Sequence, residues 1–227
     1  MPWVVAYLTI GVLNVVGEAT GRTALAQATK PLIILTLIAY TVAWRRRTWD
    51  APMSWFVAGL VAALTGDVLL NIDTALGFMG GLAAFAVMQV LYVIAFLAVP
   101  GPGLVRAWKI AIVPYAVIVI ALNVAISAGV GDLRIPVLVY SLLLGTMGVA
   151  ALDLVLRLPR RNAWQVTYGA LLFIASDGLI ALTRFGSVES ATLTSAVVMS
   201  TYIAAQGLIV AGFVRGQAVA ASRSRSR

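Results

Sequence analysis

The sequence predicts an all-α polytopic membrane protein that forms one helical bundle. Of its 227 residues, 62% are hydrophobic and only 11% are charged, and the mean hydropathy of +1.01 is too high for a water-soluble domain. Apolar runs of roughly 20 residues, the length that a helix needs to cross a bilayer, recur along the chain. The connectors between these runs contain Pro, Gly and charged residues, which end helices at the membrane surface.

Eight apolar runs predict eight transmembrane helices. No basic segment precedes the first run, so we expect it to remain as a helix rather than to be cleaved as a signal peptide. The second run opens with Lys30-Pro31 and is short for a bilayer. Breakers such as PGPG and RLPRRN separate later runs. The predicted spans are 2–18, 31–44, 54–71, 78–98, 108–128, 135–156, 164–184 and 191–214.

Basic residues are divided unevenly between the two ends of this predicted bundle. Twelve of the 16 lysines and arginines fall on one side, and the other four are Arg22, Lys30, Arg134 and Arg184. Positive charge stays on the cytoplasmic side, so both termini are expected inside. The expected location is the plasma (inner) membrane of a bacterium. The bundle would occupy residues 1–216, followed by a basic disordered tail, 217–227. We expect this tail to be solvated and to set the topology; contact with anionic lipid headgroups is the alternative.

An internal repeat relates two halves of the bundle, about 1–105 and 106–216. At a separation of 110 residues, Lys30 aligns with Tyr140, Asp67 with Asp177, and Tyr92 with Tyr202. Each half contains four spans, an even number, so the two halves share one orientation and form a parallel 4+4 repeat. In such a repeat, Asp67 and Asp177 face each other across a pseudo-twofold axis along the membrane normal.

Asp67 and Asp177 are the strongest functional candidates because each lies deep in an apolar span. A charged Asp at the centre of a membrane helix costs about 2.5–3.5 kcal/mol, so two of them predict a shared polar site. The other polar residues of the same layer, from the centre of the membrane towards its outer face, are Asn14, Lys30, Gln89, Tyr92, Tyr140, Ser176, Tyr202 and Gln206. Snorkelling of the lysine and hydrogen bonds between helices are the structural explanations for these side chains. Asp153 lies outside this layer and is expected to pair with Arg157, one turn later.

The absence of two residue types narrows the chemistry. The chain contains no cysteine and no histidine. Disulfides, thiolate metal sites, cysteine nucleophiles and histidine-based zinc hydrolysis are therefore excluded. We expect neither a metal nor a cofactor. The net charge of +8 is explained by membrane topology, so no nucleic-acid partner is expected, and no obligate protein partner is evident.

At these polar residues the chain resembles the YhhN/TMEM86 family of membrane lysoplasmalogenases. The matching residues, in order, are Lys30-Pro31, Gly66-Asp67, Leu70, Gly81, Phe85, Tyr92, Phe96, Tyr140, Met147, Gly169, Phe173, Ser176-Asp177, Tyr202 and Gln206. Two positions depart from the family pattern: Gln89 stands where the family usually has a histidine, and Ala63 where it has a serine. Gln89 can form hydrogen bonds but cannot titrate.

The resemblance implies an ether hydrolase that cleaves the vinyl ether bond of a lysoplasmalogen into a fatty aldehyde and a glycerophospho-alcohol. Acid cleavage of a vinyl ether needs one protonated carboxyl and a second carboxylate that stabilises the cation and activates water. Asp67 and Asp177 fit this pair of roles. The tyrosines, Gln89, Ser176, Gln206 and Asn14 would position substrate and water, and Lys30 would meet the lipid phosphate. Two alternatives remain open: a proton-coupled transporter or lipid-binding protein, and a structural member whose polar residues only hold helices together.

Overall fold

In the computed structural model, all regular elements of the described residues (2–44, 49–189 and 191–225) are helices. The predicted all-α fold class is confirmed. In chain order the elements are α1 (Pro2–Ala19), α2 (Thr23–Trp44), α3 (Ala51–Leu70), α4 (Ala75–Leu97), α5 (Leu104–Ala107), η1 (Lys109–Ile112), α6 (Val113–Ile126), η2 (Gly131–Leu133), α7 (Arg134–Asp153), η3 (Leu154–Leu156), α8 (Arg160–Phe185) and α9 (Thr192–Arg225).

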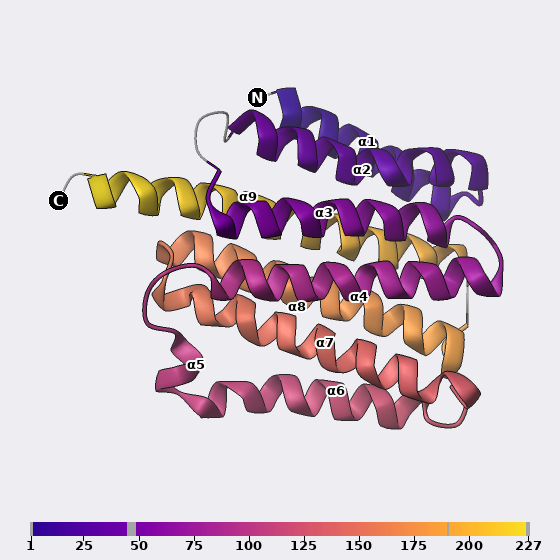
Figure 1. The fold of residues 1–227 in the computed structure, drawn as a ribbon. Helices are drawn as coiled ribbons and strands as arrows, with labels where there is room; N and C mark the ends of the chain where they lie inside the picture. The colour runs from indigo at the N-terminus through magenta and orange to yellow at the C-terminus, as the bar shows by residue number, and fades with distance from the viewer. Residues whose placement is uncertain (1, 45–48, 190, 226–227) are drawn as a thin grey trace.

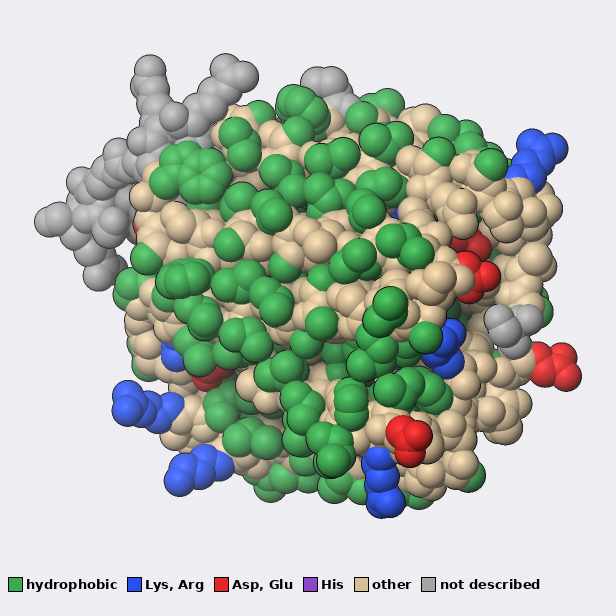
Figure 2. All heavy atoms as spheres, turned by 45° about the vertical axis from the view of Figure 1, so that its right-hand side comes forward, with side chains coloured by type: hydrophobic (Ala, Val, Ile, Leu, Met, Phe, Trp, Pro, Cys, Tyr) green, Lys and Arg blue, Asp and Glu red, His purple; other side chains and the backbone are tan. Residues whose placement is uncertain are grey.

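The outer surface of the bundle is suited to lipid. Within the described residues, seven helical segments are long and apolar enough to cross a membrane, and the shorter apolar helix at Trp3–Ala19 accompanies them. Large apolar side chains such as Val12, Ile120 and Leu193 point outwards. Figure 2 shows apolar side chains over the middle of one face, with charged ones mostly towards its two ends. A water-soluble monomer rarely exposes so large an apolar surface, so the protein is an integral multi-pass membrane protein.

The eight long helices lie side by side, and the two chain termini lie at the same end of the bundle (Figure 1). We call this end the terminal end and the other the loop end. Connectors alternate between them, as eight antiparallel spans require. The loop end carries the α1–α2, α3–α4, α6–α7 and α8–α9 connectors.

Helix α2 begins earlier than predicted, because Pro31 lies inside it rather than at its start. A proline has no backbone N–H, so the carbonyl four residues before it loses its helical partner. That carbonyl belongs to Gln27, and the side-chain amide of Asn71 donates a hydrogen bond to it at 3.0 Å. A membrane helix tolerates an internal proline when a neighbouring helix satisfies the freed group in this way.

Helix α9 ends later than predicted. It continues to Arg225, so the expectation of a disordered tail is corrected for residues 217–225, whereas 226–227 lie outside the described residues. The reason is local: GQAVAA at 216–221 contains no proline and is rich in alanine, the best helix former. Gln217 is also buried against the bundle, which extends the packing beyond residue 216.

Each predicted half of the bundle contains a hydrogen bond from an asparagine to a hydroxyl group. In the first half, the Asn14 amide of α1 donates to Thr29 Oγ1 of α2 at 3.0 Å. In the second half, the Asn123 amide of α6 donates to Ser141 Oγ of α7 at 2.8 Å. Each half thus joins its first two spans by an asparagine-to-hydroxyl hydrogen bond, a typical link between membrane helices.

Two glycines 110 residues apart allow the third and fourth spans of each half to pack closely. A Cβ added at Gly59 of α3 would lie 2.6 Å from Cδ1 of Tyr92 in α4. A Cβ added at Gly169 of α8 would lie 2.7 Å from Cγ1 of Ile209 in α9. Both distances are shorter than contacting carbons allow, so a side chain at either position would separate its helix pair.

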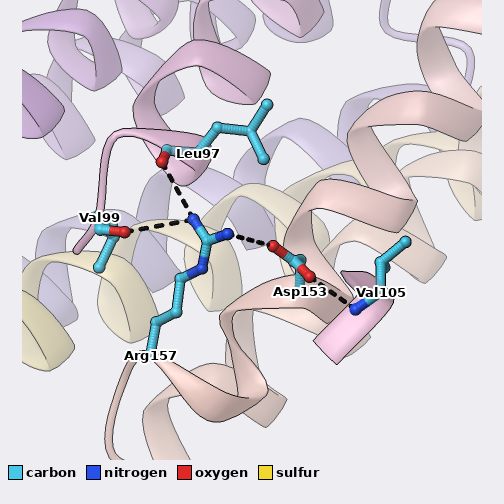
Figure 3. Close-up of polar contacts among 5 residues, drawn as sticks. All are labelled: Leu97, Val99, Val105, Asp153 and Arg157. Carbon is cyan, nitrogen blue, oxygen red and sulfur yellow. Dashed lines mark hydrogen bonds and ion pairs between the residues drawn. The ribbon is translucent and has the colours of Figure 1, made fainter. Parts of the chain in front are cut away.

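The predicted ion pair between Asp153 and Arg157 forms at the terminal end (Figure 3). We call this pair, together with its hydrogen bonds to neighbouring backbone groups, the Arg157 clamp. The charged atoms lie 2.6 Å apart, and both side chains are largely buried. The Asp153 carboxylate also accepts a hydrogen bond from the Val105 N–H, at 2.7 Å. The Arg157 guanidinium donates to the Leu97 and Val99 carbonyls at the end of α4, at 3.0 and 3.2 Å. The pair therefore joins the α4–α5 connector to the end of α7.

Candidate active site

A largely apolar cavity lies within the bundle in its half near the loop end. Its polar lining consists of Lys30, Asp67, Tyr140, Ser141, Ser176, Asp177 and Tyr202. We call it the inner cavity; its volume is about 100 Å³. The sequence predicted six of these seven polar residues. The fold thus brings most of the predicted polar layer to one place, from α2, α3, α7, α8 and α9.

Asp67 lies one turn before the end of α3 and is almost completely buried. Its Oδ2 accepts a hydrogen bond from the Tyr202 hydroxyl of α9, at 2.7 Å. Its Oδ1 has no hydrogen-bond partner among the described residues. A buried carboxyl oxygen without a partner is costly, so this atom is available to a water molecule or a substrate.

Asp177 lies about two turns before the end of α8 and faces the same cavity. Its Oδ2 accepts a hydrogen bond from the Tyr140 hydroxyl of α7. Asp67 and Asp177 thus line the same cavity. Each carboxyl is therefore held through one oxygen by a tyrosine from another helix. Both side chains are oriented before a substrate arrives.

Gln89 is fully buried in α4. Its side chain interacts with Tyr140, the partner of Asp177. Neither atom of its amide has a hydrogen-bond partner of regular geometry within the described ranges. Buried polar groups in proteins are almost always paired, so this amide needs a partner such as an internal water molecule.

Tyr92 and Gln206 lie deeper than the cavity and do not line it. The Tyr92 hydroxyl donates to Gln206 Oε1 at 3.0 Å, and Gln206 Nε2 contacts Met88 Sδ at 3.5 Å. The Tyr92 ring stacks on Phe56, with ring centroids 4.7 Å apart. These residues form the closed floor between the cavity and the terminal end, a structural role that differs from the substrate contact predicted for Tyr92 and Gln206.

Two further predicted residues have structural partners. Ser176 lines the inner cavity, but its hydroxyl donates to the Val198 carbonyl at 3.0 Å. The Asn14 amide donates to the Ala26 carbonyl and to Thr29 Oγ1, at 2.8 and 3.0 Å. Asn14 is not part of the cavity lining. The structure therefore corrects its predicted substrate contact to a link between α1 and α2.

Lys30 lies where the inner cavity meets a second cavity, which reaches the loop end. This outer cavity has a volume of about 500 Å³, and Glu18, Lys30, Thr183, Arg184, Thr194 and Ser195 form its polar lining. The two cavities share six lining residues: Lys30, Leu70, Phe78, Ile180, Val198 and Met199. Lys30 also interacts electrostatically with Asp67. Together the cavities form one path from the loop end to the aspartates.

Phe78 and Arg184 are residues of this path that the sequence did not indicate as site residues. Arg184 was one of four basic residues counted on the outer side, and Phe78 is one of many apolar residues in its span. The Arg184 guanidinium carbon lies 3.8 Å from the centroid of the Phe78 ring. This contact could be found only once the fold brought the start of α4 and the end of α8 together.

The acidic residues that line the inner cavity are Asp67 and Asp177. Among the residues that the structure describes, no three acidic side chains converge as a metal site would require. An apolar cavity with two carboxyl groups and two tyrosine hydroxyls is instead suited to acid–base chemistry on an apolar molecule.

Comparisons with known proteins agree with this description. The model of the YhhN family matches residues 25–213. A lysoplasmalogenase of Mycobacterium bovis is 32% identical, and the match covers 96% of this chain and 85% of that protein. Lysoplasmalogenase TMEM86B of Mus musculus is 30% identical, over 82% of this chain and 73% of that protein. The human TMEM86B is 34% identical over 69% of this chain and 62% of its own length. No solved structure is significantly similar to this chain.

Proposed function

This chain belongs to the YhhN family, and we propose that it is a lysoplasmalogenase of the membrane. It would hydrolyse the vinyl ether bond of a lysoplasmalogen and release a fatty aldehyde and a glycerophospho-alcohol. The similarity to lysoplasmalogenases supports the reaction class. The observation that carries the mechanism is the pair of aspartates in one apolar cavity, each held by a tyrosine. The location in a bacterial plasma membrane belongs to the same proposal.

The two connected cavities would hold a lipid with one hydrocarbon chain. The headgroup would lie in the outer cavity, and the vinyl ether in the inner cavity beside Asp67 and Asp177. The apolar walls of the inner cavity, which include Leu82, Leu122 and Leu144, would receive the first carbons of the alkenyl chain. The proposed substrate is therefore a lysophospholipid taken from the membrane.

The first step would transfer a proton from one aspartic acid to the β-carbon of the vinyl ether. The C=C π electrons form the new C–H bond, and the positive charge moves to the α-carbon and the ether oxygen as an oxocarbenium ion. The aspartate that lost its proton then lies beside this cation and stabilises it. Glycosidases divide the roles of two carboxyl groups around a similar cation.

The second step would add water to the oxocarbenium carbon. The other aspartate accepts the proton of the attacking water, which forms a hemiacetal. The hemiacetal loses its C–O bond to the glycerol, and its hydroxyl proton passes to the leaving oxygen, which yields the aldehyde and the alcohol. One carboxyl has lost a proton and the other has gained one, so the two exchange roles in the next turnover. Asp67 Oδ1 and the Gln89 amide lack a regular hydrogen-bond partner among the described residues, so they are the candidates to hold the water.

The test is aldehyde release by the purified protein from choline and ethanolamine lysoplasmalogens, with acyl-lysolipids as substrate controls. We expect Asp67→Asn and Asp177→Asn each to lower kcat by about 100-fold or more, because each removes a proton donor or acceptor. Asp132→Asn is the matched control, since Asp132 is exposed in η2 and far along the chain from either aspartate. Normal turnover in either variant would refute the aspartate mechanism. If the folded wild-type protein cleaves no lysolipid, the proposed activity itself is wrong.

A further inference from the structure

We propose that the outer cavity binds the zwitterionic headgroup of a lysophospholipid, with Arg184 as the anchor for its phosphate. This inference rests on the proposed function, because it extends the same substrate path to the loop end. It assigns a binding role to Arg184, Phe78 and Glu18, and it predicts which lipid headgroups the protein prefers.

The Arg184 side chain is held at the outer cavity by an aromatic ring. Arg184 lies in the last turn of α8, and its guanidinium carbon is 3.8 Å from the centroid of Phe78, in the first turns of α4. Phe78 in turn packs edge-on against Phe185, with ring centroids 6.2 Å apart. A cation over an aromatic face is stabilised and loses side-chain freedom, so the charge stays at the cavity.

The charge of Arg184 is available to a ligand. Within the described part of the chain, no carboxylate lies within 4 Å of Arg184 or Lys30, and no hydrogen bond from the Arg184 guanidinium to a protein acceptor is formed. A guanidinium has five N–H groups in one plane, and contact with a ring on one face leaves those groups free. Their planar arrangement matches two phosphate oxygens. Lys30 lines the same cavity and would supply a second positive charge on the inner side of the phosphate.

The path beside Phe78 fixes the order of the lipid groups along it. Phe78 lines both the inner and the outer cavity, whereas Arg184 lines only the outer one. A phosphate at Arg184 therefore leaves the glycerol beside Phe78 and the vinyl ether beside the aspartates. This order matches the chemical order of a lysoplasmalogen, in which glycerol separates the phosphate from the ether.

A carboxylate in the outer cavity favours a headgroup that ends in a cation. Glu18, in the last turns of α1, lines the same cavity as Arg184 and Lys30. A headgroup with only negative charge would be repelled by this carboxylate, whereas an ethanolamine ammonium or a choline would be attracted to it. The mixed charges therefore select a phosphate followed by an amine.

The experiment compares two substrates that differ only at the phosphate: an ethanolamine lysoplasmalogen and the matching alkenylglycerol without a phosphate. We expect Arg184→Gln to raise KM for the first by roughly tenfold with kcat nearly unchanged, as loss of a charged hydrogen bond predicts. The kinetics with the alkenylglycerol should not change. Arg184→Lys should restore part of the affinity, because it keeps the charge. Arg134→Gln, which removes an exposed arginine at the same end, is the control. Equal effects of Arg184→Gln on both substrates, or no effect on either, would overturn the proposal.

A second experiment tests the preference for the headgroup by measuring binding, so it does not require hydrolysis. Binding of a non-hydrolysable 1-O-alkyl lysophospholipid to the purified protein is measured by calorimetry, with an ethanolamine or a phosphoglycerol headgroup. We expect Glu18→Gln to reduce the preference for ethanolamine, and Arg184→Gln to weaken both ligands. Phosphate-dependent binding without hydrolysis would refute the proposed function but retain this inference. Hydrolysis that is indifferent to Arg184 and Glu18 would refute this inference alone.

Discussion

At the scale of single residues, the Gln89 amide is the most unusual group of the site. A buried polar group without a partner costs about 1–3 kcal/mol, so a fully buried Gln89 is expensive unless it binds something. Gln206 has the same side chain and is equally buried, but it accepts a hydrogen bond from Tyr92. We therefore expect Gln89 to act in the reaction and Gln206 to stabilise the fold.

The contrast leads to a prediction for two leucine variants. We expect Gln89→Leu to keep or raise the melting temperature, because it removes two buried atoms that lack regular hydrogen-bond partners among the described residues, but to lower kcat by roughly tenfold through loss of a positioned water. Gln206→Leu should instead lower the free energy of unfolding by about 1–3 kcal/mol, because it leaves the Tyr92 hydroxyl without its acceptor.

Thermal unfolding in detergent and aldehyde release measure the two effects separately. Gln27→Leu, at an exposed position of α2, controls for added apolar surface. If Gln89→Leu destabilises the protein and leaves kcat unchanged, the amide is a structural group, and the water must be held by Asp67 alone.

At the scale of helices, the sequence predicted which elements exist better than where they end. Seven of the helical segments are long and apolar enough to span a membrane, the shorter Trp3–Ala19 is also apolar, and these properties are visible without the fold. The start of α2 was misplaced because Pro31 looks like a helix start until Asn71 from α3 is seen to satisfy the Gln27 carbonyl. The end of α9 was misplaced because Gln217 packs into the bundle.

The sequence predicted the aspartates of the candidate site but not their hydrogen-bond partners. Aspartates deep in apolar spans are costly, so their positions alone indicated a site. The partners of the aspartates depend on how each helix is rotated about its own axis. The spacing of residues along the sequence does not define this rotation. Tyr140 bonds Asp177 within its own half, whereas Asp67 bonds Tyr202 from the other half. The predicted 110-residue repeat aligns Lys30 with Tyr140, and in the structure Lys30 interacts with Asp67 and Tyr140 with Asp177.

The Arg157 clamp yields a prediction at the scale of elements. Removal of one partner of a buried ion pair leaves the other charge uncompensated, so Arg157→Gln should lower the free energy of unfolding by about 3 kcal/mol or more. It also frees two carbonyls at the end of α4. Arg161→Gln, at an exposed position nearby, should change stability by about 0.5 kcal/mol or less.

Chemical denaturation in detergent gives the two free energies. Because the clamp lies at the terminal end and the cavity at the loop end, aldehyde release per folded Arg157→Gln molecule should remain normal. A stable Arg157→Gln protein would show that packing alone positions the α4–α5 connector. A stable but inactive one would show coupling between the two ends.

At the scale of the whole molecule, the two ends of the bundle differ in their access to the aspartates. Aromatic residues fill the half near the terminal end, where Phe56 and Phe96 pack on Phe213 with ring centroids 4.6 and 5.3 Å apart. The path to the aspartates starts at the loop end. The four basic residues of that end, against twelve elsewhere, predict that it faces away from the cytoplasm. The substrate should therefore come from the outer leaflet.

Single cysteines test this orientation directly, because the chain contains none of its own. We expect Ser187→Cys, in the exposed α8–α9 connector, to react with a membrane-impermeant maleimide in intact cells. Ala51→Cys, exposed at the start of α3 at the terminal end, should react only after the cells are permeabilised. Denatured samples of both variants show the total amount of reactive thiol. The reverse labelling pattern would place the loop end in the cytoplasm, and the cavity would then take its lipid from the inner leaflet. Labelling of both variants in intact cells would indicate mixed orientation, which a 12-to-4 division of positive charge argues against.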